Sequence, residues 1–107
     1  MNYSELDLCI IRDCLGLPYM RSSMRYFARL EEEQDMVLFK PSQNIRDAWI
    51  ALEKFSGEFI SLRQGSIHKF DCKIIHNTRI TTGSGATPSL AICDAIIKAV
   101  AKSKEVN

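Results

Sequence analysis

The sequence has almost no net charge, no long apolar run and no segment typical of a secretory signal. Its 107 residues include 14 basic and 13 acidic side chains, a formal net charge of +1. No global electrostatic field therefore favours nucleic acid or an anionic membrane as a partner. No apolar run approaches the roughly 20 residues of a bilayer-spanning helix, and a signal peptide's basic start and cleavage site are missing. We expect a soluble, cytoplasmic protein without a membrane partner and without strong nonspecific nucleic-acid binding.

The cysteines and histidines lack the spacing of a metal site. The chain has no Cys-x-x-Cys pair, and His68, Cys72 and His76 would span roughly 26 Å along a strand, too far for one ion. Cys72 and Cys93 fall on apolar faces of their elements, where thiols behave as small hydrophobic groups. We predict that both are buried and that the protein has no metal site and no cofactor.

No catalytic signature stands out either. A nucleophilic site needs a Ser, Cys or Thr beside a base that a third group orients. His76 could be paired with Asp71 or Asp94, but the sequence has no Gly-x-Ser-x-Gly elbow to mark a nucleophile. We therefore predict no catalytic residues and expect a protein that is not an enzyme.

Apolar spacing predicts three helices. Residues 4–15 form a short amphipathic pattern that Ser4 would cap and Gly16 would end. In residues 45–55, apolar side chains recur on one helical face, with Asn44 as the cap and Trp49 as a core anchor. Pro88 favours the start of a third helix, which runs to about residue 102.

Alternation of apolar and polar residues predicts strands. Residues 58–63 and 67–75 indicate a hairpin, and residues 79–82 add a short strand. Residues 25–30 and 35–40 suit a second hairpin, whereas a helix over residues 23–34 is an equally good interpretation. We predict one domain, residues 1–107, of the α+β class: a small, mainly antiparallel sheet sandwiched by helices, an α/β/α sandwich.

The segment before the last helix has two interpretations. It can be a plain loop from strand to helix, in which glycine relieves backbone strain and Thr87 caps the helix. Alternatively, its free amides and the helix dipole could hold a nucleotide-like anion. The anion-binding residues would be Gly83, Ser84, Gly85 and Thr87. The segment lacks a P-loop lysine and the third glycine of a dinucleotide fingerprint, which favours the plain loop.

The last helix is apolar over more than one stripe. Such a helix packs on more than one side within the chain or lies at a contact between subunits. The second interpretation predicts a homodimer closed through Ile92, Ile96 and Val100 of this C-terminal helix.

Three blocks of the sequence resemble the phage ABA sandwich domain, a family of small proteins from tailed bacteriophages and prophages. They are Glu5-Leu-Asp7 running to Leu15-Gly-Leu-Pro-Tyr19, the helix Ile45–Phe55 with its Ala48-Trp49 pair, and the Thr87-Pro88 helix to Ala99. Phe70-Asp-Cys72 stands where the family more often has Trp-x-Cys, and residues 20–40 match no part of its pattern. The resemblance implies an α/β/α sandwich of phage or prophage origin. It implies no reaction, ligand or catalytic residue.

Arginines alternate with aromatic residues early in the chain, and acidic residues follow them. Arg and Tyr are typical of binding hot spots, although a solvated, salt-bridged surface has the same composition. Because this segment departs from the family pattern, it is where partner specificity would be placed. The candidate partner-binding residues are Tyr19, Arg21, Arg25, Tyr26, Arg29, Glu31, Glu32 and Glu33.

These observations lead to three functional hypotheses. The first is a phage or prophage accessory protein that binds a host bacterial protein or complex without catalysis, as an anti-defence, anti-CRISPR-like inhibitor would. The second is a protein that binds or sequesters a small ligand, a nucleotide-like anion held by the Gly83–Thr87 segment. The third is a small hydrolase or nuclease. All three place the protein in the cytoplasm of the bacterial host.

Overall fold

The computed structural model describes residues 2–55 and 58–105. The helices are α1 (Tyr3–Leu8), a π-helical segment η1 (Cys9–Cys14) that continues it, α2 (Ile45–Phe55) and α3 (Pro88–Glu105). The strands are β1 (Tyr19–Ser22), β2 (Arg25–Ala28), β3 (Val37–Leu38), β4 (Glu58–Ser66), β5 (Lys69–His76) and β6 (Arg79–Gly85). They form two three-stranded antiparallel sheets, in the orders β1-β2-β3 and β4-β5-β6.

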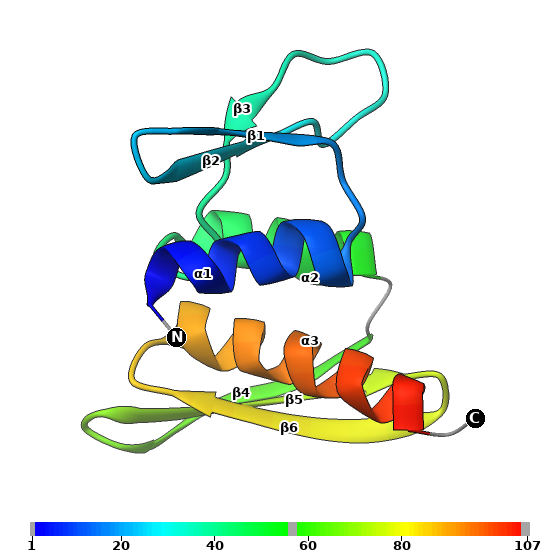
Figure 1. The fold of residues 1–107 in the computed structure, drawn as a ribbon. Coiled ribbons are helices and arrows are strands. Elements are labelled where there is room, and N and C mark those ends of the chain that lie inside the picture. Colours follow the sequence, from blue (N-terminus) through cyan, green and yellow to red (C-terminus); the bar gives the residue numbers. More distant parts are fainter. Residues whose placement is uncertain (1, 56–57, 106–107) are drawn as a thin grey trace.

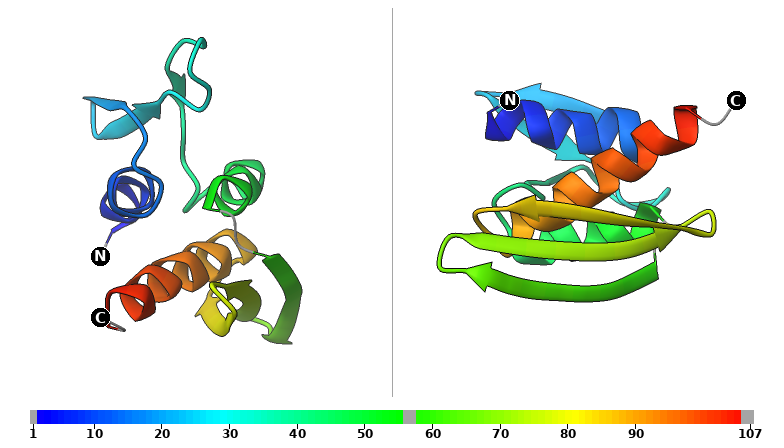
Figure 2. Two further views of the ribbon diagram at one scale, coloured as in Figure 1. Left: turned by 90° about the vertical axis from the view of Figure 1, so that its right-hand side faces the viewer. Right: turned by 90° about the horizontal axis from the view of Figure 1, so that it is seen from below.

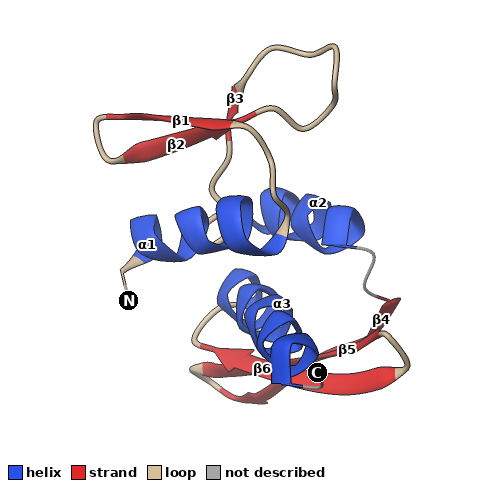
Figure 3. Cartoon of the chain, turned by 45° about the vertical axis from the view of Figure 1, so that its right-hand side comes forward, coloured by secondary structure: helices blue, strands red, loops and turns tan. Residues whose placement is uncertain are grey.

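The helices lie between the two sheets (Figures 1 and 3). Helices α1 and α2 run side by side, and α3 crosses them on the inner face of the β4–β6 sheet (Figure 2). The predicted α+β class and the antiparallel pairing are confirmed. The order of the layers differs from the expected one, in which helices cover both faces of one sheet. The reason is that residues 19–38 form a second sheet, whose strand β2 contacts α1.

The core lies where α3 meets β5, β6, α2 and η1. Its fully buried residues include Ile10, Ile11, Phe39, Ala48, Cys72, Ile74, Ile92, Cys93 and Ile96. Helix α3 therefore packs on more than one side within the chain, as its apolar width predicts. Ile92 and Ile96, two of the three residues of the predicted homodimer contact, are fully buried within one copy, so they are not free for such a contact. A homodimer through the C-terminal helix stays a prediction. The prediction of buried Cys72 and Cys93 is confirmed.

Strand β6 and helix α3 approach each other closely at two glycines. A Cβ on Gly83 would lie 2.1 Å from the backbone nitrogen of Ala95, and a Cβ on Gly85 would lie 2.6 Å from the Cβ of Leu90. Both glycines belong to β6 and pair with β5, so the predicted loop at Gly83–Gly85 is wrong. Glycine is needed here because the helix packs directly on the strand backbone.

Residues 23–40 contain strands, which decides between the hairpin and the helix predicted for this segment. Strand β2 pairs with β3, as the hairpin interpretation predicts, and the helix over residues 23–34 is wrong. Strand β1, which the sequence did not predict, pairs with all of β2. Along β2, Tyr26 and Ala28 are buried whereas Arg25 is exposed and Phe27 is half-buried, the two-residue period of a strand.

An asparagine caps each of the helices α1 and α2, and Trp49 lies partly at the surface. Asn44 caps α2 as predicted, because its Oδ1 accepts from the N–H of Arg46 at 2.9 Å. Helix α1 is instead capped by Asn2, which accepts from Glu5 N–H at 2.8 Å, so the predicted Ser4 cap is wrong. The prediction for Trp49 is also wrong. Its side chain is 38% exposed and packs edge to face on Phe59.

Candidate protein-binding site

The β1–β3 sheet has an inner face toward the helices and an outer face that is open. Directly paired residues share a face of an antiparallel sheet. Tyr19 pairs with Ala28, and Arg21 pairs with the buried Tyr26. These four residues therefore lie on the inner face, where the Tyr19 and Tyr26 rings meet edge to face with their centroids 6.0 Å apart.

The outer face carries an apolar row that crosses all three strands. Met20 on β1 pairs with Phe27 on β2, which in turn pairs with Leu38 on β3. Met20 is 52% exposed and Leu38 is 36% exposed. The half-buried Phe27 lies between these two exposed residues, and contiguous apolar patches on an open sheet face occur at protein interaction sites.

Two arginines flank this row. Arg25 and Arg29 lie two residues before and after Phe27, and strand alternation puts all three on the outer face. Strand pairing extends to Arg29, whose N–H donates to the carbonyl oxygen of Pro18 at 3.0 Å. In the described part of the chain, Arg25 and Arg29 form no ion pair. We refer to Met20, Phe27, Leu38, Arg25 and Arg29 as the outer face.

The turn between β1 and β2 holds two residues in the left-handed region. Ser23 has φ of 50° and Met24 has φ of 62°. Such turns normally take Asn or Gly, because a Cβ makes this conformation unfavourable. The hydroxyl of Ser4 on α1 donates to the carbonyl oxygen of Met24 at 3.1 Å, which ties the turn to the helix below it. The Met24 side chain itself is exposed.

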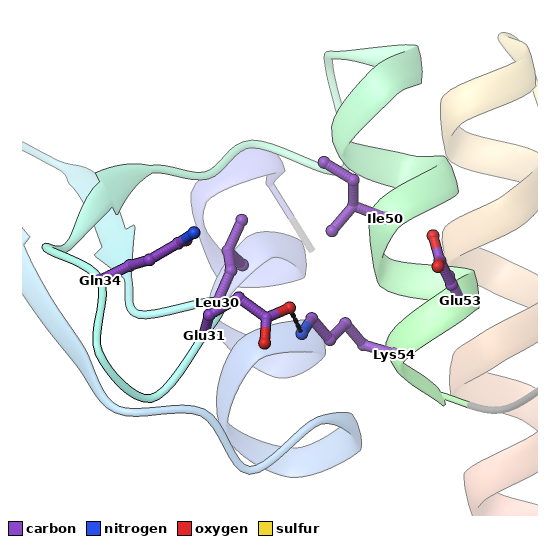
Figure 4. Close-up of a pocket in the computed structure, with 6 residues that line it drawn as sticks. All are labelled: Leu30, Glu31, Gln34, Ile50, Glu53 and Lys54. Atoms are coloured by element: carbon purple, nitrogen blue, oxygen red, sulfur yellow. Dashed lines mark hydrogen bonds and ion pairs between the residues drawn. The ribbon is translucent and has the colours of Figure 1, made fainter.

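The acidic segment after β2, which contains Glu31, Glu32 and Glu33, forms one wall of a pocket. The pocket, about 540 Å³, lies between this segment and α2 (Figure 4). Its lining comprises Leu30, Glu31, Gln34, Ile50, Glu53 and Lys54. The half-buried Lys54 forms an ion pair with Glu31, with Nζ and Oε1 2.5 Å apart. This contact holds the segment against α2 and neutralises one of the predicted partner-binding carboxylates.

The structure thus divides the predicted partner-binding residues into three groups. Only Arg25 and Arg29 lie together on the outer face. Tyr19, Arg21 and Tyr26 belong to the inner face, and Tyr26 is buried, so it is unavailable to a partner. The exposed Glu31, Glu32 and Glu33 lie in the segment between β2 and β3.

Sequence reasoning missed the apolar members of the outer face. The missed residues are Met20, Phe27 and Leu38, together with Met24 at the turn. A signal was present for Phe27, which alternates with Tyr26 and Ala28 in the pattern of a strand that is buried on one side. No signal in the sequence shows that Met20 and Leu38 pair with Phe27, because register depends on the turn and on β1, which was not predicted.

The proposed anion-binding segment has little capacity to bind one. The N–H of Ser84 donates to Asp94 Oδ2 at 2.8 Å, so a carboxylate already occupies the direction in which an anion would lie. Gly83 and Gly85 are covered by α3. Thr87 caps the helix as predicted, since its Oγ1 accepts from Leu90 N–H at 3.2 Å.

Burial perturbs three titratable groups outside the outer face. Asp7 is buried and accepts from Ser42 N–H at 2.9 Å, and desolvation raises the pKa of its carboxyl group. Burial raises the pKa of the Cys72 thiol to about 11 and also raises the pKa of Cys93. Among the residues that the structure describes, no group of three His, Cys, Asp or Glu side chains is placed to hold a metal ion.

The family model for the phage ABA sandwich domain matches residues 18–97. The chain belongs to the phage ABA sandwich domain family. The resemblance noted from the sequence is therefore confirmed, and with it the phage association. The matched range contains the whole outer face, including the segment that the resemblance left unplaced.

A solved structure has the same fold. It is a phage protein from Bacillus cereus ATCC 14579, with a TM-score of 0.68 and 16% sequence identity, over 91% of this chain and 90% of that one. At this identity the likeness concerns the fold alone. No curated protein matches the chain. Over residues 2–55 and 58–105, no helix is both long and apolar enough to cross a membrane.

Proposed function

We propose that the protein is a non-enzymatic phage or prophage accessory protein that binds a protein or complex of the bacterial host through its outer face. An anti-defence, anti-CRISPR-like inhibitor is one form of this function. It would act in the host cytoplasm. The observation that carries the proposal is the apolar row of Met20, Phe27 and Leu38 between Arg25 and Arg29.

The composition of the outer face fits a protein partner. Interface hot spots combine an apolar centre with arginine, and charged groups at the rim guide the approach of the partner. Met20 is also flexible and polarisable, so it adapts to an irregular partner surface. Arg25 and Arg29 form no ion pair among the described residues, and they are therefore available to carboxylates of a partner.

Affinity capture from bacterial lysate tests this proposal. The baits are the tagged wild-type protein, Met20→Asp, and Ile80→Asp as a matched control. Ile80 on β6 pairs with Ile75 on β5 and is exposed on the β4–β6 sheet, so both changes add one carboxylate to an exposed apolar position. Bound proteins are identified by mass spectrometry, and small molecules released on heating are analysed in parallel.

We expect one host protein to be retained in stoichiometric amount by the wild type and by Ile80→Asp, and lost from Met20→Asp. Equal retention by all three baits would place the contact elsewhere on the molecule. A released nucleotide without any retained protein would contradict the proposal and would favour a sequestering function.

A further inference from the structure

The turn between β1 and β2 presents an apolar side chain at an energetic cost. Met24 is 63% exposed, and its backbone φ of 62° lies in a region that residues with a Cβ avoid. A glycine or an asparagine would satisfy this turn better. Fold stability alone therefore does not explain a methionine at this position.

We propose that Met24 anchors the host contact by inserting into an apolar pocket whose rim carries carboxylates, on an acidic protein surface. This inference rests on the proposed function and names the chemistry of the partner. The anchor extends the outer face, because Met24 directly precedes Arg25 and lies at the end of the same hairpin as Met20 and Phe27.

Charge determines the kind of surface that fits. Residues 14–30 contain three arginines, Arg21, Arg25 and Arg29, and no aspartate or glutamate. Two of them, Arg25 and Arg29, lie on the outer face, which is therefore locally cationic on a chain of net charge +1. Carboxylates on the partner would complement it, and a basic partner surface would be repelled. A duplex DNA would satisfy the arginines, but it could take up the methionine only by unstacking neighbouring base pairs, which costs free energy.

The anchor is also held in place before binding. The hydrogen bond from Ser4 Oγ to the carbonyl oxygen of Met24 fixes the turn against α1, and pairing of Ser22 with Arg25 closes the hairpin directly beside it. A side chain presented by a fixed backbone loses less conformational entropy on binding than one on a mobile loop. The position thus has the properties of a preorganised anchor.

Two glycine substitutions separate anchoring from folding. Ser23→Gly and Met24→Gly each relieve the strain of a left-handed backbone conformation in the same turn, so neither should lower the melting temperature. Only Met24→Gly removes the apolar side chain. Met24→Leu serves as the conservative variant that retains it. The probes are the purified host protein recovered by capture and, separately, a short DNA duplex, each titrated at several salt concentrations.

We expect Met24→Gly to weaken binding of the host protein at least about tenfold, the effect of losing a hot-spot side chain. Ser23→Gly and Met24→Leu should bind as the wild type does, and the affinity should fall as salt rises. Binding of Met24→Gly as tight as that of the wild type would overturn the inference, while the proposed function would stand. An affinity independent of salt would exclude the acidic rim. Binding of DNA that is insensitive to Met24→Gly would overturn the protein partner. If the wild type retains no host protein, the proposed function itself fails.

Discussion

Gly83 on β6 packs against Ala95 on α3 so closely that a Cβ on the glycine would lie 2.1 Å from the alanine's backbone nitrogen. This contact seats the last helix directly on the second sheet. It also explains the glycines before this helix, because only glycine lets the strand and the helix approach so closely. The same pattern in sequence is shared by anion-binding loops.

Gly83→Ala should destabilise the fold by about 3 kcal/mol, at the upper end of the cost of overpacking, because the Ala95 and Ala91 backbone cannot move aside as a flexible side chain would. Urea unfolding measures the change. Gly65→Ala is the control, since a Cβ there meets Asp71 Oδ2 at 3.5 Å and the Lys69 carbonyl oxygen at 4.0 Å, both ordinary contacts. Similar midpoints for the two variants would contradict the close approach of β6 and α3.

The buried carboxyl group of Asp7 should make stability depend on pH. Desolvation raises its pKa in the folded state above 3.8, so the folded protein binds more protons than the unfolded chain in the window above that value. Stability therefore falls as the pH rises through this window and levels off above the raised pKa.

Asp7→Asn tests this pH dependence, because the amide oxygen can still accept from Ser42 N–H while the titration is removed. Urea midpoints between about pH 4 and pH 7 should decline for the wild type and lose this contribution in the variant. Parallel pH curves for the two proteins would show that Asp7 is not the cause.

The ion pair between Glu31 and Lys54 should affect the local stability of the acidic segment more than the free energy of unfolding of the whole protein. Both side chains are partly exposed, so Glu31→Ala should cost no more than about 1 kcal/mol. We expect faster hydrogen exchange in residues 30–36, where the segment loses its contact with α2. Glu32→Ala, which removes an exposed neighbouring carboxylate, should leave exchange unchanged. Equal exchange in both variants would contradict a tethering role.

The two buried thiols should resist alkylation in the folded protein. With a pKa of about 11 for Cys72, about one thiol in a thousand is ionised at pH 8, and only the thiolate reacts. Iodoacetamide labelling followed by peptide mapping should show Cys72 and Cys93 modified in urea but protected in buffer. Rapid modification of either cysteine in buffer would mean that the α3 interface opens readily.

Sequence reasoning succeeded where a local pattern determines the structure. Asn44 caps α2, Phe70 to Ile74 alternate as a strand, and the apolar width of α3 indicates packing on several sides. Each of these depends on residues that are neighbours in sequence. The phage family also followed from short motifs of fixed order.

The remainder depends on contacts between distant segments. The layer order follows from residues 19–38 forming a separate sheet, and no residue within that segment specifies its position over α1. The spacing of Trp49 is that of a core residue, but its ring packs at the surface on Phe59 of the next element, β4. Of the predicted site, Arg25 and Arg29 share a face because β2 is a strand. Met20 and Leu38 join them only through register.

The most direct test of the outer face is a calorimetric titration of the purified host protein with wild type and with the double variant Arg25→Glu, Arg29→Glu. The matched control reverses Arg63 and Lys73, two exposed cations on the second sheet. The outer-face variant should lose at least about a hundredfold in affinity, because each charge-assisted contact contributes about 1.5–3 kcal/mol. Its unfolding free energy should stay within about 0.5 kcal/mol of the wild type. An affinity equal to that of the wild type would contradict the assignment of the outer face as the binding surface.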